Sequence, residues 1–209
     1  MNNIWKQFGN TPMDFAMVAS LFPEYKCKHN KVSALEKKGD IIRLKQGLYV
    51  PNPELSGKQL SLFIIGNNLY GPSYISMQSA LRYYGLIPEQ VFTICSMTMK
   101  RSQMFHNELA WFEYVHIDKE VFPIGVRIET SDDGTSFLIA TPEKALCDLI
   151  SNIPYLNLRY EKEILTWLEE DIRFDMDEMF KFDTSIMREY AEVGKKKNMI
   201  NQIIKIIEG

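Results

Sequence analysis

The sequence predicts an α+β protein, and three observations lead to this class. Apolar residues recur at helical spacing near the N-terminus and again from residue 160 onward. Two β-prone runs flank a glycine-containing turn at residues 45–47, and a similar pair flanks residues 131–134. Of the 209 residues, 45% are hydrophobic and 24% charged, which is an ordinary globular composition with enough material for a sizeable core.

The first forty residues predict two helices in close succession. Thr11 followed by Pro12 is typical of a helix start, because a threonine side chain can cap the helix and proline fits its first position. Apolar residues then recur at helical spacing as far as Pro23. A second helix is expected over residues 25–38, with Gly39 as the left-handed residue that ends it.

A basic hairpin follows the second helix directly. Residues 40–44 and 48–51 are β-prone, and Gly47 can supply the positive φ of the turn between them. Helix, short turn, helix and hairpin, in this order, form the pattern of a winged helix-turn-helix. We therefore expect that domain over residues 1–52. A linker around residues 52–57 then leads to a mixed α/β domain with a helical C-terminus over residues 58–209.

The charge distribution singles out the N-terminal segment. Residues 1–52 hold eight Lys and Arg against four Asp and Glu, a net charge of +4, whereas the remainder carries −7 and the whole chain −3. Non-specific DNA affinity depends on a local cluster of cations that releases counterions, and not on total charge. The asymmetry thus favours a DNA-binding module attached to an acidic body, with a chance solvated face as the alternative.

The second helix and the hairpin supply the candidate contacts with double-stranded DNA. At 100° per residue, Lys26, Asn30, Ser33 and Lys37 share the helix face opposite Tyr25, Val32 and Leu35, so they can reach base edges and phosphates. Hairpin residues suit the phosphate backbone or minor groove. The full candidate set, including neighbours that would serve if the helix phase differs, is Lys26, Lys28, His29, Asn30, Lys31, Ser33, Lys37, Arg43, Lys45 and Gln46.

The remainder of the chain predicts a mixture of helices and strands. A helix is expected from Gly71-Pro72-Ser73 to Tyr84, and Thr141-Pro142 marks the start of another, where Thr141 caps and Glu143 favours the positive helix end. Strands are expected over residues 91–98, 109–117, 125–129 and 136–140, the last two as a hairpin around Ser131-Asp132-Asp133-Gly134. Further helices are expected over residues 161–169, 175–180, 185–193 and 195–207.

Three stretches together resemble one family. They are KKGDIIRLKQGLYV (residues 37–50), YGPSYISMQSAL (residues 70–81) and IATPEKALCD (residues 139–148). In this order they are similar to the AbiEi-type antitoxins of bacterial abortive-infection systems, and the resemblance covers about residues 10–150. The first stretch is generic for winged helices, whereas the second and third are more specific.

The resemblance implies a transcriptional repressor of its own operon whose C-terminal domain acts as an antitoxin. In such type IV toxin–antitoxin systems the toxin resembles nucleotidyltransferases and is usually encoded next door, and direct contact between toxin and antitoxin is not assumed. The partners implied are therefore operator DNA and, functionally, a nucleotidyltransferase-like toxin.

Enzyme signatures are scarce, so we expect neither catalysis nor a cofactor. The chain has no phosphate loop and no serine in a nucleophile elbow, and Cys27-x-His29 offers only two metal ligands. Two alternatives stay open: a nuclease guided by the basic segment, and a protein–protein adaptor whose winged helix no longer binds DNA. The sequence shows no signal peptide and no long apolar run, which predicts a cytoplasmic protein without a membrane partner.

Overall fold

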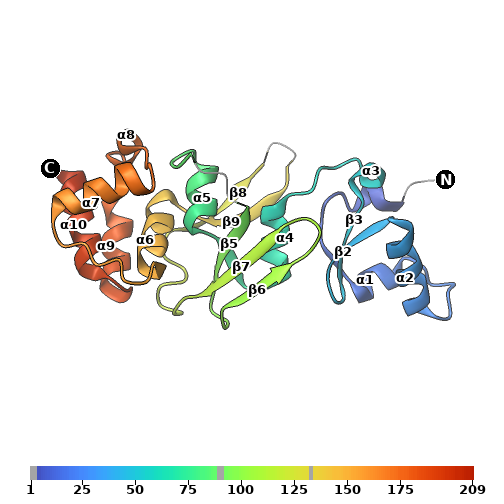
Figure 1. Cartoon of the computed structure of the whole chain (residues 1–209). Coiled ribbons are helices and arrows are strands. Elements are labelled where there is room, and N and C mark those ends of the chain that lie inside the picture. The colour runs from blue at the N-terminus through green and yellow to red at the C-terminus, as the bar shows by residue number, and fades with distance from the viewer. Residues whose placement is uncertain (1–3, 89–91, 132–133) are drawn as a thin grey trace.

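The structure is a computed structural model that describes residues 4–88, 92–131 and 134–209. It is an elongated α+β protein (Figure 1). An N-terminal unit lies at one end, a sheet in the centre and a group of C-terminal helices at the other end. The helices are α1 (Phe15–Ser20), α2 (Lys28–Lys38), α3 (Pro53–Ser56), α4 (Leu62–Leu69), α5 (Met77–Tyr83), α6 (Pro142–Asn152), α7 (Glu161–Thr166), α8 (Met176–Met179), α9 (Thr184–Val193) and α10 (Lys197–Glu208), with a 3-10 helix η1 (Ile4–Gln7) and a π-helical turn η2 (Trp167–Asp171). The strands are β1 (Met13–Asp14), β2 (Ile41–Lys45), β3 (Leu48–Pro51), β4 (Ser73–Ile75), β5 (Thr93–Thr98), β6 (Gln103–His106), β7 (Trp111–His116), β8 (Val126–Thr130) and β9 (Ser136–Ala140).

The N-terminal unit is built on a three-stranded antiparallel sheet in the order β1-β3-β2. The predicted hairpin is confirmed: β2 and β3 pair, and Gly47 adopts φ 77° in the turn between them. Helices α1 and α2 contact each other, and α2 also contacts β2. Together these elements enclose a small core of Trp5, Met13, Val18, Val32, Leu35, Ile41 and Tyr49.

The hairpin has two buried faces. Ile41 and Tyr49 belong to the small N-terminal core, whereas Leu44 and Val50 belong to the large core of the rest of the chain. Successive strand residues point to opposite faces, so one short hairpin can serve both cores. The hairpin is therefore packed between the N-terminal helices and α4, which contacts β2.

A six-stranded mixed sheet, in the order β6-β7-β5-β4-β9-β8, forms the centre of the molecule. β5 and β7 run parallel, as do β4 and β9, and the other neighbours are antiparallel. Along β7, the Tyr114 hydroxyl donates to the Gly66 carbonyl in α4, while Glu113 and Val115 face a groove beside α5 and α6. Because neighbouring strand residues alternate, α4 covers one face of the sheet, and α5 and α6 cover part of the other.

The C-terminal helices extend the core at the end opposite the N-terminal unit (Figure 1). α9 packs against α6 and α10, and Met199, Ile200, Ile203 and Ile204 of α10 are buried in the large core. The isoleucine cluster of this helix thus packs on its own chain. No helix in the described ranges is both long and apolar enough to cross a membrane.

Two predicted helix starts near the N-terminus are wrong. Met13 and Asp14 pair with Tyr49 and Leu48 as β1, so the first helix begins at Phe15, where the Asp14 carboxylate accepts from the Met17 backbone N–H at 2.7 Å. Strand pairing has overridden the Thr-Pro signature. The second helix begins at Lys28 and not at residue 25, so Tyr25 lies in the preceding loop. Gly39, with φ 79°, ends this helix as expected.

Other differences lie between residues 52 and 106. The expected linker contains α3, whose Leu55 packs against the N-terminal core. The helix expected from Gly71-Pro72-Ser73 is first a buried strand, β4, because residues 73–75 pair with both β5 and β9. Neither α4 nor β6 was predicted. Val91, Asp132 and Asp133, which fall in the predicted strand and turn, lie outside the described residues.

Candidate nucleic-acid interface

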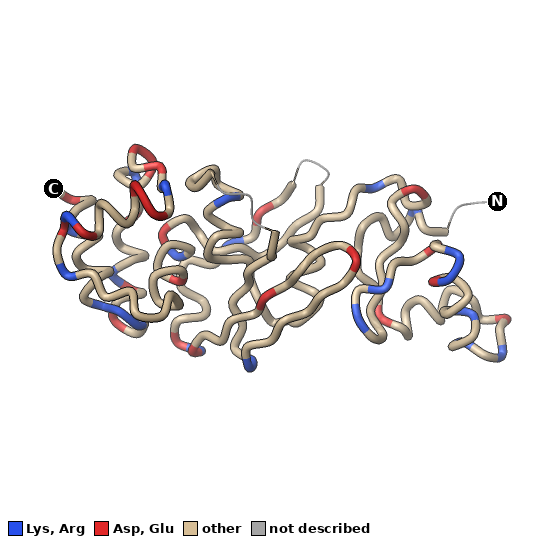
Figure 2. Tube along the Cα trace, in the orientation of Figure 1, with Lys and Arg blue, Asp and Glu red and all other residues tan. Residues whose placement is uncertain are grey.

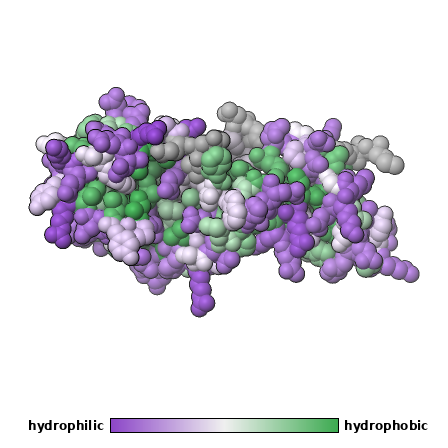
Figure 3. Space-filling model, viewed as in Figure 1, coloured by the Kyte–Doolittle hydropathy of each residue, from purple (hydrophilic) through white to green (hydrophobic). Residues whose placement is uncertain are grey.

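The outer face of α2 is polar and exposed. Val32 and Leu35 point into the N-terminal core, whereas Asn30, Ser33 and Lys37 are exposed on the opposite side of the helix, in the phase that the sequence predicted. Lys26 is also exposed, in the loop just ahead of the helix. Hydrophilic side chains accordingly predominate at this end of the molecule (Figure 3).

Two lysines of the candidate set brace the loop before α2. Lys28 donates from Nζ to the Phe22 carbonyl at 2.6 Å. The Lys31 ammonium lies 4.5 Å from the ring centre of Phe22 and 4.4 Å from that of Tyr25, where cation–π attraction holds it. Both side chains are half-buried and fix the turn between α1 and α2. They are therefore less free than Lys26 or Lys37 to reach a ligand.

His29 stands at the first turn of α2 and is exposed. Its ring stacks on Phe15, with the ring centres 4.4 Å apart and the planes tilted by 31°. This contact ties the start of α2 to the start of α1 and limits the rotation of the imidazole. His29 therefore borders the outer face of α2 in a fixed orientation.

The hairpin residues of the candidate set differ in their surroundings. Arg43 and Gln46 are exposed, and the Arg43 guanidinium lies 3.8 Å from the Glu36 carboxylate of α2. Lys45 contradicts the expectation of a free wing residue. Its Nζ donates to the carbonyl of Leu69, the last residue of α4, at 2.5 Å. Burial and the neighbouring Lys100 lower the pKa of Lys45. Lys45 thus joins the hairpin to the body of the protein.

The charges around α2 leave two lysines unpaired on its outer side. Lys38 pairs with Asp40 at 3.2 Å, and Glu36 is close to Arg43. Lys26 and Lys37 form no ion pair with any residue in the described ranges. Acidic residues are instead concentrated around α7, η2 and α8, at the far end of the chain (Figure 2). The N-terminal end is thus electrostatically suited to a polyanion.

The dimensions and chemistry of α2 suit the major groove of DNA. The helix has 11 residues and is about 16 Å long. Its exposed asparagine can pair with the edge of an adenine, and its lysines can bind guanine or phosphate oxygens. Tyr49 of β3 is only 7% exposed and packs in the small core, so its side chain is not part of this surface.

The central body contains a buried polar cluster that was not predicted, although its residues lie in the stretches 70–81 and 139–148. The predicted Thr141 cap is confirmed, since Thr141 accepts from the Lys144 backbone N–H. One turn further, Lys144 and Asp148 form an ion pair at 3.4 Å with both side chains 0% exposed. Asp148 also accepts hydrogen bonds from the hydroxyls of Tyr74 at 3.0 Å and Ser76 at 2.7 Å.

Tyr74, Ser76, Lys144 and Asp148 are all 0% exposed, so this cluster is part of the core. Burial raises the pKa of Asp148 and lowers that of Lys144, while the attraction between the two groups opposes both shifts. Lys144 also donates to the Val121 carbonyl at 2.8 Å and lies 4.4 Å from the Tyr190 ring centre. The cluster therefore joins β4, α6, α9 and the loop after β7. In the sequence, the i,i+4 spacing of Lys144 and Asp148 on a predicted helix could have indicated this ion pair.

No group of three or more His, Cys, Asp and Glu side chains among the described residues is arranged to hold a metal ion. Cys27 and His29, the pair noted in the sequence, are both exposed at the start of α2. No protein-family model matches the chain, and no curated protein matches it. Its function is therefore inferred from the geometry of α2 and the hairpin, and from the three quoted stretches.

Proposed function

We propose that this protein is a DNA-binding transcriptional repressor that places α2 in the major groove of its operator. The observation that carries the proposal is the outer face of α2, where Asn30, Ser33 and Lys37 are exposed opposite a buried apolar face. The order of elements around it also supports the proposal. Strand β1, α1, α2 and the β2–β3 hairpin follow one another as in a winged helix-turn-helix.

The packing of the hairpin refines this proposal. Lys45 is held on α4, so the phosphate contacts from the hairpin are assigned to Arg43 and Gln46. Asn107, in the turn after β6, donates to the Leu44 carbonyl at 3.1 Å and also holds the hairpin on the central body. We therefore expect the N-terminal unit and the central body to approach DNA as one piece.

We further propose that the protein serves as the antitoxin of a type IV toxin–antitoxin operon, paired with a nucleotidyltransferase-like toxin. Support comes from the AbiEi-like stretches at residues 70–81 and 139–148. Residues from both stretches meet in the buried cluster of Tyr74, Ser76, Lys144 and Asp148. The resemblance therefore involves residues that hold the central body together, and that body is where we place the antitoxin activity.

A titration of DNA with charge-reversal variants tests the DNA-binding proposal. The full-length protein is titrated into a labelled duplex from the region upstream of its own gene, at several salt concentrations. Lys37→Glu should weaken binding strongly and flatten the salt dependence, since it removes one phosphate or base contact and adds repulsion. Lys162→Glu, the same change at an exposed position of α7, is the matched control and should leave binding unchanged. Equal effects of the two changes would contradict a role for α2.

The antitoxin proposal needs a variant that leaves the fold intact. Deleting residues 1–52 would remove Leu44 and Val50 from the large core, so a truncated chain tests folding as much as function. The surface variant Asn30→Ala/Lys37→Glu avoids this problem. It should abolish repression of the operon but still protect cells that express the adjacent toxin gene. Loss of protection by this folded variant would show that the two activities cannot be separated.

A further inference from the structure

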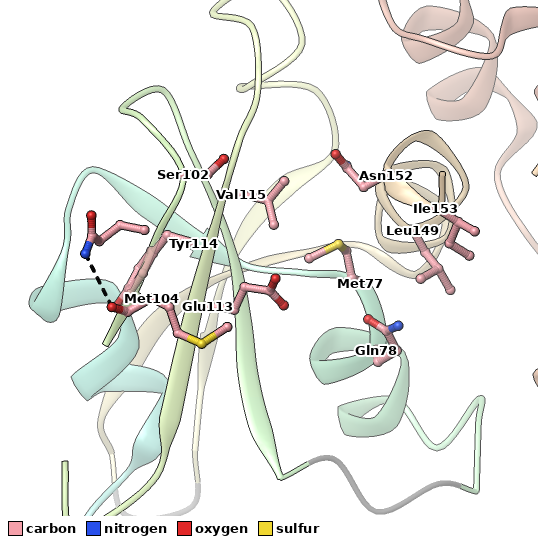
Figure 4. A pocket seen from close by; sticks show the side chains of 11 residues that line it. Met77, Gln78, Ser102, Met104, Glu113, Tyr114, Val115, Leu149, Asn152 and Ile153 are labelled. Carbon is pink, nitrogen blue, oxygen red and sulfur yellow. Dashed lines mark hydrogen bonds between the residues drawn. The ribbon is translucent and has the colours of Figure 1, made fainter. Parts of the chain in front are cut away.

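An open groove of about 540 Å³ lies on the sheet face opposite α4. Strands β6 and β7 form one wall, and the start of α5 and the end of α6 form the other (Figure 4). The groove exists because α5 and α6 cover the middle of the sheet and stop short of its β6 edge. Its volume lies in the range of sites that bind small molecules or single side chains.

Glu113 supplies the charge of this groove. Among the described residues that line the groove, it is the only Asp, Glu, Lys, Arg or His. Its carboxylate points into the space between the walls (Figure 4). No Lys, Arg or His of the described ranges forms an ion pair with it. Among the described residues, the buried Cys95 thiol donates to its carboxylate, at 3.8 Å. Burial and the charge of Glu113 raise the pKa of Cys95 to about 12, so this thiol stays protonated and donates.

Thioethers and aliphatic side chains flank the carboxylate. Met104 is the cross-strand partner of Glu113 and is 50% exposed. Leu149 of α6 and Ile153, directly after α6, line the opposite wall. Met77 lines the second wall at the start of α5, and its backbone φ of 50° is in the left-handed region that residues other than glycine rarely adopt. Such backbone strain persists only where the surroundings impose it, and it is concentrated at functional sites.

Side-chain amides complete the lining. The Asn152 amide nitrogen donates to the Asp148 carbonyl within α6, which leaves its amide oxygen free to accept. Gln78 is exposed beside Met77 and forms no side-chain hydrogen bond with a described residue. The groove therefore offers one carboxylate, amide acceptors and flexible apolar walls, a set that matches a cationic group on an alkyl stem.

We propose that this groove binds an alkylammonium or alkylguanidinium group, with the cation on Glu113 and the alkyl stem between Met77, Met104 and Leu149. The same chemistry is presented by a small diffusible amine and by a Lys or Arg side chain of a peptide. The site lies on the central body and is independent of the DNA-binding role proposed for α2.

The test uses full-length protein labelled with ¹³C at its methionine methyl groups, which report from both walls of the groove. The probes are n-butylguanidinium, n-butylammonium, and a blocked Gly-Arg-Gly peptide, with n-butanol and butyrate as uncharged and anionic controls. The cations should shift the Met77 and Met104 signals in a saturable manner, and the controls should not. Tighter binding of the peptide would assign the site to a partner polypeptide, and tighter binding of the free cations would assign it to a small amine.

Two variants tie the binding to Glu113. Glu113→Gln should weaken cation binding about tenfold or more, because it removes the charge and keeps the shape. Glu108→Gln removes an exposed carboxylate from the turn between β6 and β7, outside the groove, and should have no effect. Met104→Lys, at an exposed position, should compete by placing an ammonium opposite Glu113. Absence of a saturable shift, or equal binding by the Glu113→Gln and Glu108→Gln variants, would overturn the proposal.

Discussion

Replacement of Asp148 by asparagine should strongly destabilise the protein. Asp148 and Lys144 are both 0% exposed and 3.4 Å apart, and Asp148 accepts hydrogen bonds from Tyr74 and Ser76. Asparagine has nearly the same shape and keeps an oxygen that can accept from these hydroxyls. What the substitution removes is the negative charge, so the buried Lys144 ammonium loses its counter-ion.

The magnitude follows from the burial of the pair. Breaking a fully buried ion pair by removing one partner costs about 3–5 kcal/mol, because the remaining charge is uncompensated. Since a domain is stable by only about 5–15 kcal/mol, this is a large share of its free energy of unfolding. The double variant Lys144→Met/Asp148→Asn removes the unpaired charge and loses the bond to the Val121 carbonyl, worth about 1 kcal/mol. It should therefore recover at least about 2 kcal/mol.

Urea unfolding of the three proteins, followed by circular dichroism, measures these differences. The midpoint of Asp148→Asn should fall and that of the double variant should return toward the wild type, with similar slopes. A loss below about 1 kcal/mol for Asp148→Asn would refute the reasoning, because it would mean that Lys144 is not charged or not buried in the folded protein.

Three further predictions concern cysteine chemistry, alkaline pH and Lys45. In the native protein only Cys27 should react with a thiol reagent, since it is exposed while Cys95 and Cys147 are buried, and Cys27→Ser should remove the reaction. Burial and Glu113 raise the pKa of Cys95 to about 12. The protonated Cys95 thiol therefore contributes to stability below the pKa of the unfolded thiol, and this contribution is lost as the pH rises toward 12. Cys95→Ala should flatten the decline of the urea midpoint across this range. Lys45→Met should cost about 1 kcal/mol of stability by removing the bond to Leu69, yet leave the salt dependence of DNA binding unchanged, and a reduced slope would show that Lys45 contacts phosphate.

Local sequence signals predicted the elements that are governed by local chemistry. The Gly39 helix end, the turn at Gly47 and the Thr141-Pro142 helix start are fixed by backbone conformation and capping within a few residues, and the structure has all three. The exposed positions of Asn30 and Lys37 also follow from the helical period alone.

Tertiary pairing decided the elements that the sequence did not reveal. Met13–Asp14 and Ser73–Ile75 are strands only because distant segments pair with them, and each directly follows a proline in a pattern that predicted a helix start. Lys45 is a basic residue of a hairpin, and nothing in its neighbours indicates that the end of α4 lies beside it. The groove around Glu113 likewise combines residues from separate segments, so only the fold brings them together.

The central claim is tested most directly by substituting Asn30 and measuring the affinity of the protein for operator DNA and for random DNA. Asn30 is exposed in the first turn of α2, where helices of this type usually make base contacts. Asn30→Ala should lower affinity for DNA from upstream of the gene by about 1–3 kcal/mol and leave binding to random duplex nearly unchanged. Asn198→Ala, at an exposed position of α10, is the control and should change neither. If Asn30→Ala, with unaltered thermal unfolding, leaves both affinities at the wild-type level, then α2 does not read the operator.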